Sequence, residues 1–436
     1  MSSLNRTIRQ PRAVNAAGTS VPSISAEKQL NRLVLASMLW EKQFYMDGAT
    51  SASLLKELVT KVSADKIAAL AIKARNDYKL RHVPLFLCRE LARVGKLTAA
   101  TLNAVVQRAD EMGEFLSMYW SEGKSPLSNQ VKKGLALAFG RFNEYQLAKY
   151  DRASASVSIR DVMFLVHAKP VSVEQEVLFQ RVANKELKTP DTWETELSAG
   201  ADKGATFTRL MAEKKLGALA FLRNLRNMAQ AGVPENLIRE YAATVNVDKV
   251  LPFRYIAAAR IVPQFEDMLE TMMFRSLAKA EKLPGKTVLM VDVSGSMFGT
   301  KVSEKSDLDR FDAAAALAML CVEVCEDFEV YTFSNKLVRV APRKGFALAD
   351  ALKSSQEVAG TKLGQAIKSL QANSKYDRLI VISDEGSQDT VGSPKTDKGY
   401  ILNVASYQNG VNRNDWLTIT GFSESVIDYI REVEKE

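Results

Sequence analysis

The stretch TVLMVDVSGSMFG, residues 287–299, decides the fold of the C-terminal part of the chain. It opens with an apolar run, which is typical of a strand buried on both faces of a parallel sheet. The run ends in Asp292, and Ser294 and Ser296 follow at alternate positions. One carboxylate and two hydroxyls are therefore expected at the carboxyl end of a strand, where open α/β sheets bind their ligands.

The sequence that follows predicts a doubly wound α/β domain over residues 284–436. Strand patterns alternate with helix patterns, as expected for right-handed βαβ units and a mainly parallel sheet. The predicted strands lie at 287–294, 328–334, within 376–389, and at 400–408 and 416–422, and the predicted helices at 308–326, 345–355, 363–373 and 423–436.

Two further oxygen-bearing residues are expected at the same edge of this sheet. Thr361 precedes a predicted helix, and Asp384 follows the strand pattern RLIVIS. Hard oxygen ligands with few charges suit Mg²⁺ better than Zn²⁺ or copper. The sequence thus predicts a divalent cation site at Asp292, Ser294, Ser296, Thr361 and Asp384. The alternative is a capped helix start, in which Asp292 only accepts hydrogen bonds from the backbone.

No catalytic constellation is predicted for this domain, so the protein is not expected to be an enzyme. A strand-end Asp can accept a phosphoryl group, but the second carboxylate expected two residues on is replaced by Ser294. A Ser-His-Asp arrangement is excluded because the only histidines, His82 and His167, precede the domain. A metal-dependent phosphohydrolase is therefore the least favoured alternative.

The preceding residues 26–283 predict helices almost throughout, after an extended N-terminal arm over residues 1–25. Many helices in series with short spacers resemble a HEAT-like solenoid. Residues 284–436 hold 18 Lys+Arg against 22 Asp+Glu, which leaves 41 against 29 in the preceding part. The basic character of the helical part indicates a polyanionic partner there, although solvated helix faces with surplus Lys would give the same count.

Composition sets broad limits on localisation. No apolar run approaches the length of a membrane span, so no membrane association is expected. Cys88, Cys321 and Cys325 are few, odd in number and irregularly spaced, which favours reduced core residues of a cytoplasmic protein.

The motifs resemble two known modules. The D-x-S-x-S sequence, the later Thr361 and the later Asp384 resemble the metal-ion-dependent adhesion site (MIDAS) of von Willebrand factor A domains. The helical part is similar to the TROVE domain of Ro proteins in RLVLASMLWEKQFYMDG, LAKYDRASASVSIRDVMFLVHAKP, WETELSA, LGALAFLRNLRNMAQAGV and LPFRYIAAAR. The resemblance covers roughly Arg12 to Glu436.

This resemblance implies a ring of helical repeats that binds small structured non-coding RNA of the Y type and single-stranded 3′ ends of misfolded RNA, in RNA quality control or processing. It also implies a monomer, an exoribonuclease as a possible partner, and a metal site open to a carboxylate of a partner protein. Carried over position by position, the RNA-contacting cluster is Lys149, Tyr150, Arg152, Arg160, Asp161 and His167.

One departure from the family pattern concerns the RNA surface. Ile159 replaces a histidine, which would remove a polar donor from that surface and weaken recognition of Y-type RNA. The main alternative to RNA binding is a Mg²⁺-dependent adaptor for protein interactions through the von Willebrand A domain.

Overall fold

The computed structural model describes residues 25–36, 48–152, 154–248, 250, 252–301, 308–384, 386–404, 416–420 and 425–434. All but the last residue of the predicted arm, and residues 37–47 of the first family-like stretch, lie outside this range. The chain forms two compact units, one containing Met46–Ser276 and the other Leu277–Glu436. Each unit is described by itself below.

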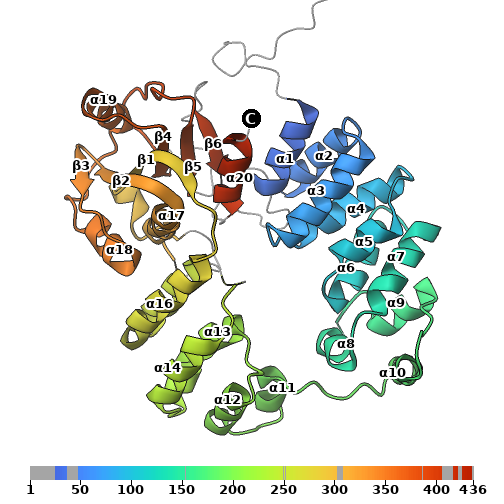
Figure 1. Ribbon diagram of the computed structural model, residues 1–436. Helices are drawn as coiled ribbons and strands as arrows, with labels where there is room; N and C mark the ends of the chain where they lie inside the picture. Colours follow the sequence, from blue (N-terminus) through green and yellow to red (C-terminus); the bar gives the residue numbers. More distant parts are fainter. Residues whose placement is uncertain are drawn as a thin grey trace, which may run out of the picture. The chain divides into compact units, whose positions relative to one another are not determined.

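The first unit is helical in all its described elements, which follow one another along the chain in Figure 1. After α1 (Ala26–Ala36), its helices are α2 (Gly48–Val59), α3 (Ala64–Asn76), α4 (His82–Arg93), α5 (Ala99–Val105), α6 (Ala109–Tyr119), α7 (Asn129–Phe139), α8 (Glu144–Tyr150), α9 (Ile159–Val166), α10 (Val173–Asn184), α11 (Trp193–Ser198), α12 (Lys203–Ala212), α13 (Ala218–Gln230), α14 (Glu235–Thr244), α15 (Pro252–Ile261), the 3₁₀ turn η1 (Pro263–Phe265) and α16 (Glu266–Leu277).

Side-chain caps set where many of these helices begin. The Ser128 hydroxyl accepts the Val131 N–H at 3.3 Å at the start of α7, and Asn143 and Gln146 form a capping box at the start of α8. Caps of this kind satisfy amide groups that have no partner inside the helix. The structure divides two long helical patterns of the sequence, at 51–77 and 98–120, into two helices each, α2–α3 and α5–α6, and the Thr98 hydroxyl caps the start of α5.

Helix α6 is held by close contacts on two of its faces. Its Glu111 is fully buried and accepts from Arg75 of α3 at 2.5 Å. On another face, Gly113 lies so close to the segment after α8 that a Cβ there would stand 2.5 Å from the Val157 carbonyl oxygen. The absent side chain lets residues 154–158 lie directly against α6, where Ser117 and Ser156 share a hydrogen bond of 2.7 Å.

The second unit contains a six-stranded sheet in the order β3-β2-β1-β4-β5-β6. Its elements are β1 (Leu283–Asp292), the 3₁₀ turn η2 (Gly295–Met297), α17 (Arg310–Val324), β2 (Cys325–Phe333), β3 (Leu337–Val340), α18 (Gly345–Lys353), α19 (Leu363–Asn373), β4 (Arg378–Ser383), β5 (Gly399–Asn403), β6 (Leu417–Thr420) and α20 (Ser425–Glu434). The predicted combination of a helical part and a mainly parallel α/β sheet is confirmed.

One strand was not predicted from the sequence. β3 has only four residues and pairs antiparallel with β2 as a hairpin. A pattern this short has no clear period, so it does not stand out from a loop. The helix predicted to run to residue 326 also ends earlier, because Cys325 and Glu326 already belong to β2.

The order of the strands reverses beside β1. The chain passes from β1 to β2 on one side and returns to β4 on the other, so the order reverses between β1 and β4. Val288 and Met290 of β1 pack in one core cluster with Leu363 and Ile367 of α19, while α17 also contacts β1. This is the position at which open α/β sheets bind ligands.

None of the helices among the described residues is both long and apolar enough to cross a membrane.

Candidate functional site

The five residues predicted as metal ligands lie at one edge of the sheet, at the end of β1 and in the loops beside it, and we call them the strand-edge site. Asp292 ends β1, and Asp384 directly follows the neighbouring strand β4. The loop after β1 is joined to the loop that carries Thr361, because the Gly295 N–H donates to the Ala359 carbonyl at 3.1 Å. Ser294 and Ser296 belong to the same turn as Gly295. The fold thus brings three separate segments of the chain to the edge of the sheet beside the end of β1.

Asp292 is buried and hydrogen-bonded through both oxygens of its carboxylate. Its side chain is fully buried, and its two carboxylate oxygens accept the Ser294 N–H at 2.8 Å and the Ser383 hydroxyl at 2.7 Å. Burial raises the pKa of Asp292 to about 6, while the hydrogen bonds from Ser294 and Ser383 act in the opposite direction. Ser383 was not predicted as part of the site, because the last residue of an apolar strand carries no signal of its own.

Asp384 has a cationic partner that the sequence did not indicate. The Arg310 guanidinium, at the start of α17, donates to its carboxylate at 2.9 Å and to the Ser296 carbonyl at 3.3 Å. Both side chains of the pair are at most 5% exposed. Because the partners lie 74 residues apart, no local pattern could have joined them.

The chemistry of this edge fits a hard divalent cation. The Ser294 and Ser296 hydroxyl oxygens lie 3.4 Å apart, close to the separation of about 3 Å between adjacent ligands of an octahedral Mg²⁺. Ser294, Thr361 and Asp384 are buried, whereas Ser296 is exposed. No group of three or more His, Cys, Asp or Glu residues suited to a metal occurs among the described residues. The donor set is therefore hydroxyl-rich, which does not suit softer metals.

A groove of about 1050 Å³ runs over the helical unit between the end of α6, the start of α7 and α9. We call it the helical groove, and its aromatic and cationic lining residues are Trp120, Lys124, Lys132, Phe164 and His167. The Trp120 indole donates to the Ser125 carbonyl at 2.8 Å, and the Lys124 ammonium lies 5.4 Å from its ring. Phe164 is 52% exposed, with the Arg160 guanidinium 5.4 Å from its ring.

Four of the predicted RNA-contacting residues lie on hollow surfaces of this unit. Asp161 and His167 line the helical groove, while Tyr150 and Arg152 line an adjacent cavity. Tyr150 is half-buried, with the Arg108 guanidinium 4.5 Å from its ring, and Arg152 is exposed. Lys149 is also exposed and contacts Tyr145 of its own helix.

Arg160 and Asp161 have structural contacts. Arg160 is half-buried and donates from Nε to the Ala183 carbonyl at 2.7 Å, which links α9 to the end of α10. Asp161 accepts from the Ser158 hydroxyl at 2.7 Å and forms the capping box of α9. The hydrogen bond from Ser158 holds the pKa of Asp161 below its usual range. Asp161 also lines the helical groove, so it combines a capping contact with a place at the surface.

The interpretation of position 159 is corrected by the structure. Ile159 is 3% exposed and lines the cavity beside Tyr150 rather than an open surface. An apolar side chain suits this place because α9 packs there against α6 and α7. Its replacement of a histidine therefore changes the interior of a cavity and removes no donor from an exposed surface.

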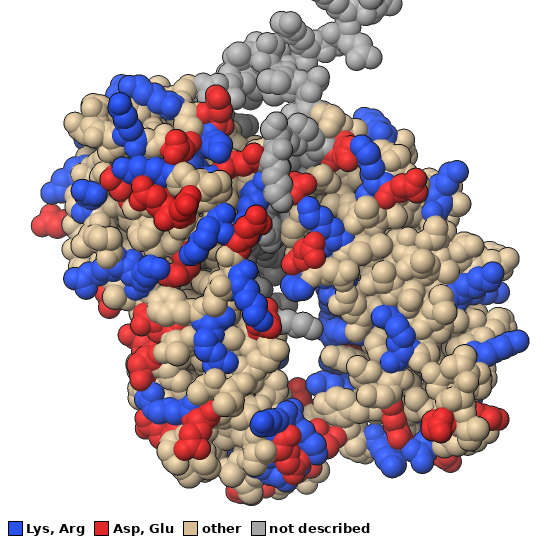
Figure 2. All heavy atoms as spheres, in the orientation of Figure 1, with Lys and Arg blue, Asp and Glu red and all other residues tan. Residues whose placement is uncertain are grey.

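The sequence did not single out Trp120, Lys124, Lys132 or Phe164 as part of a site. Each is an ordinary residue of an amphipathic helix or a loop, and the groove forms only where separate segments meet. Overall charge would not have revealed it either. Figure 2 shows basic and acidic side chains interspersed over the face it draws, without one uniform basic patch.

Comparisons with known proteins agree with both units. Residues 180–301 match the TROVE domain, and residues 286–396 match the Ro60 vWA domain. A solved structure described as the crystal structure of the Deinococcus radiodurans RO (RSR) protein superposes with a TM-score of 0.69 at 19% identity, covering 93% of this chain and 98% of that one. The two proteins therefore share their fold over nearly the whole length of both chains.

Two curated relatives also match part of the chain. The telomerase protein component 1 of Mus musculus is 30% identical over 110 residues, and that of Rattus norvegicus matches with the same identity and length. These matches cover 24% of this chain and 4% of each relative. The chain therefore corresponds to only a small part of those proteins.

Proposed function

We propose that this chain is an RNA-binding protein of the Ro kind, because residues 180–301 match the TROVE domain and residues 286–396 match the Ro60 vWA domain. Its ligands would be small structured non-coding RNA and the single-stranded 3′ ends of misfolded RNA, in RNA quality control or processing. The observation that carries this proposal is the helical groove, whose lining combines the exposed Phe164 and the half-buried Trp120 with cations.

This combination is the chemistry that a single-stranded RNA requires. Bases without a pairing partner stack on aromatic rings such as Phe164, and their phosphates are neutralised by lysines such as Lys124 and Lys132. Arg152 extends the cationic surface at the neighbouring cavity. The proposed action is binding, and no turnover is assigned to it.

Neighbouring lysines of α7 provide a matched test. Lys132 lines the helical groove, while Lys133 is exposed and lies outside its lining. We expect Lys132→Glu to weaken binding of a hairpin RNA with a single-stranded 3′ tail about tenfold, and Lys133→Glu to leave it nearly unchanged. Loss of one phosphate contact should also reduce the slope of log affinity against log salt by about 0.7.

Fluorescence anisotropy at several salt concentrations measures both quantities. Equal losses in the two variants would show that the binding surface lies elsewhere. Equal affinity of the unaltered protein for a blunt RNA duplex or for double-stranded DNA would count against recognition of single-stranded ends.

We propose further that the strand-edge site holds Mg²⁺ or a similar divalent cation. Asp292, Ser294, Ser296, Thr361 and Asp384 would provide its oxygens directly or through water. The cation would offer an open position to a carboxylate of a partner protein, and the exposure of Ser296 beside buried neighbours favours access from that side. This is also the observation that favours the alternative function, a metal-dependent adaptor.

Two aspartates at opposite ends of the parallel strands β1 and β4 separate a metal effect from a general loss of charge. Asp292 ends β1, whereas Asp377 precedes β4 and accepts the Lys286 N–H at 2.7 Å at the opposite edge of the sheet. Calorimetric titration with Mg²⁺ should show binding in the unaltered protein and in Asp377→Asn, and none in Asp292→Asn. Retained binding in Asp292→Asn would refute the assignment.

A further inference from the structure

A cavity of about 530 Å³ lies beside the helical groove, between α4, α6 and the segment that follows α8. We call it the α4–α6 cavity. Its apolar lining includes Phe86, Met118, Val157 and Ile159, and its polar lining includes Arg89 and Glu114. The volume is within the range of about 300–1,000 Å³ typical of pockets for small organic groups. A flat ring therefore fits the cavity in both size and chemistry.

Two polar atoms in the cavity lining have no hydrogen bond. Oε1 of Glu114 accepts from Arg81, but its Oε2 is buried and accepts none. This Oε2 lies 3.8 Å from the His82 Nε2, which is too far for a hydrogen bond. Arg89 is 2% exposed, and its Nε is likewise buried without an acceptor. A buried polar atom without a hydrogen bond costs free energy. A ligand that supplied a donor to Glu114 and an acceptor to Arg89 would therefore bind more tightly.

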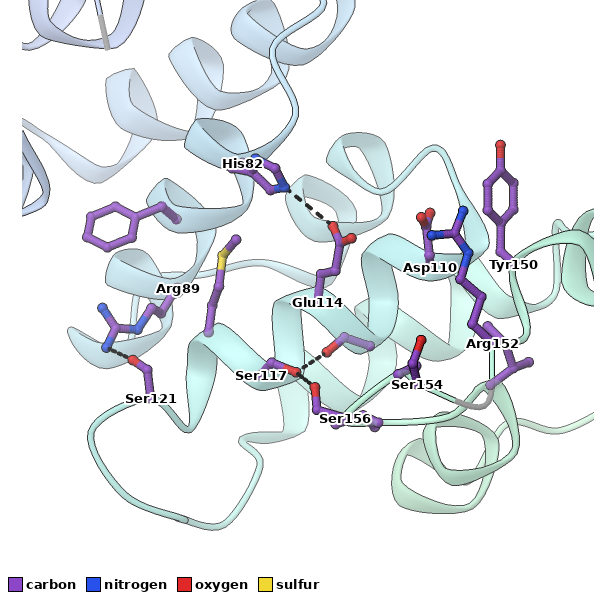
Figure 3. A pocket seen from close by; sticks show the side chains of 16 residues that line it. His82, Arg89, Asp110, Glu114, Ser117, Ser121, Tyr150, Arg152, Ser154 and Ser156 are labelled. Carbon is purple, nitrogen blue, oxygen red and sulfur yellow. Dashed lines mark hydrogen bonds and ion pairs between the residues drawn. The ribbon is translucent and has the colours of Figure 1, made fainter. Parts of the chain in front are cut away.

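Figure 3 shows how these groups lie around the cavity. Glu114 points toward His82, Arg89 points toward Ser121, and Tyr150 and Arg152 lie together at the other side. The Arg89 guanidinium donates to the Ser121 hydroxyl at 2.9 Å, which orients it. Recognition groups thus come from α4, α6 and the end of α8 together.

The mixture of charges excludes an anion as the occupant. A phosphate in the cavity would meet Asp110 and Glu114 as well as the arginines. Asp110 is already engaged with Arg81 and Arg108, at 2.7 Å from each, so the nearest cations are partly neutralised. A neutral flat ring with donors and acceptors at its edge meets no such repulsion.

The α4–α6 cavity is continuous in its lining with the helical groove. Ser117, Ser156 and Val157 contribute to both hollows, and the Ser117–Ser156 hydrogen bond lies between them. A strand bound in the groove could therefore place one base in the cavity while its backbone stays outside, near the exposed Arg152.

We propose that the α4–α6 cavity receives one unstacked nucleobase of the bound RNA, and that guanine is the base it favours. Guanine presents two adjacent N–H donors, which one carboxylate can accept, and acceptors that suit an arginine. Phe86, Met118 and Tyr150 would cover the apolar faces of the ring. This inference rests on the proposed RNA-binding function and adds a base preference to it.

The test uses hairpin RNAs whose 3′ tail consists of uridines with a single guanosine at a series of positions. We expect one position to strengthen binding about tenfold over the all-uridine tail. Inosine, which lacks the 2-amino group, or an abasic site at that position should remove the gain. Glu114→Gln should also remove the preference for guanosine over inosine.

A second variant tests the cavity without altering its charges. Ala155 is exposed on the cavity rim, so Ala155→Trp should fill the opening and abolish the guanosine effect. Ala199→Trp, at an exposed position after α11, is the control and should keep it. Thermal unfolding of all variants verifies that they fold.

The outcomes separate this inference from the function on which it rests. If no tailed RNA binds, the proposed function fails. If tailed RNA binds but Ala155→Trp and Ala199→Trp retain the same guanosine preference, only the cavity assignment fails. Competition by free GMP at the concentration that suffices for the tailed RNA would overturn the assignment to a base carried by a strand.

Discussion

The strand-edge site and the helical groove use charge in opposite ways. At the strand-edge site, both carboxylates are buried and hydrogen-bonded, and one of them pairs with the buried Arg310. In the helical groove, Lys124 is exposed and Lys132 is half-buried, beside aromatic rings that are themselves partly exposed. A buried, paired charge affects the stability of the fold as well as the binding of a ligand, whereas an exposed charge affects mainly binding. Substitutions in the two regions should therefore have different consequences.

The largest expected effect is that of Asp384→Ala on stability. Removing this carboxylate leaves the Arg310 guanidinium, whose side chain is 5% exposed, without its ion pair. We expect the free energy of unfolding to fall by about 3–5 kcal/mol, as measured by urea denaturation. RNA affinity should stay unchanged, because this residue belongs to the other unit.

The control for this substitution is Asp350→Ala, at an exposed position of α18, with an expected change within about 0.5 kcal/mol. A loss below about 1 kcal/mol for Asp384→Ala would mean that the Arg310 pair is not a structural element, and the contrast between the two regions would weaken.

The next effect concerns the boundary between the cavity and the groove. In Gly113→Ala, the new Cβ would stand 2.5 Å from the Val157 carbonyl oxygen, so the segment after α8 must move away from α6. We expect a loss of about 1–3 kcal/mol in the free energy of unfolding, together with weaker RNA binding. Gly140→Ala is the control, because its Cβ would meet only ordinary contacts, the nearest at 3.6 Å. Similar stability of the two variants would argue against the close approach at Gly113.

A smaller effect in free energy is expected for Arg152→Glu. This side chain is exposed, so the substitution should leave the free energy of unfolding unchanged within about 0.5 kcal/mol. Its charge should nonetheless weaken RNA binding about tenfold at low salt, and less at high salt because of screening. Anisotropy and urea denaturation of the same preparation give both values. A loss of stability without a loss of affinity would show that Arg152 stabilises the fold and does not bind RNA.

The last effect is a change in the dependence of stability on pH in the α/β unit. Burial alone would raise the pKa of Glu434, but its hydrogen bond and ion pair with the buried Arg378 hold that pKa below the usual range. A lowered pKa in the folded state stabilises the protein above the unfolded pKa of about 4.3, and this contribution is lost as the pH falls through the folded value. Glu434→Gln should therefore be less stable than the unaltered protein at pH 7.

Urea denaturation between pH 7 and pH 3 follows the difference between these two proteins, which should shrink toward acid. Glu357→Gln, at an exposed position, should show no such convergence. A difference that stays constant over this range would assign the effect of Glu434→Gln to packing rather than to its charge.

The fold followed from the sequence where the signal is local and periodic. The apolar run that ends in Asp292 and the alternation of strands and helices predicted a mainly parallel sheet, and its strand order then determined which loops meet. The four-residue β3 and the breaks between α2 and α3 and between α5 and α6 were not predicted, because a short strand has no period and a turn can interrupt a continuous helical pattern.

For the sites, the sequence by itself determined the kind of atoms available: carboxylate and hydroxyl oxygens after β1, and basic and aromatic residues around position 150. Only the tertiary structure decided which of them meet. It paired Asp384 with Arg310 from 74 residues away, placed Ile159 inside a cavity, and assembled the groove from Trp120, Lys132 and Phe164. The physical reason is that chain order constrains hydrogen bonds between close neighbours, whereas burial, ion pairs and cavities arise from packing between segments that are distant in the sequence.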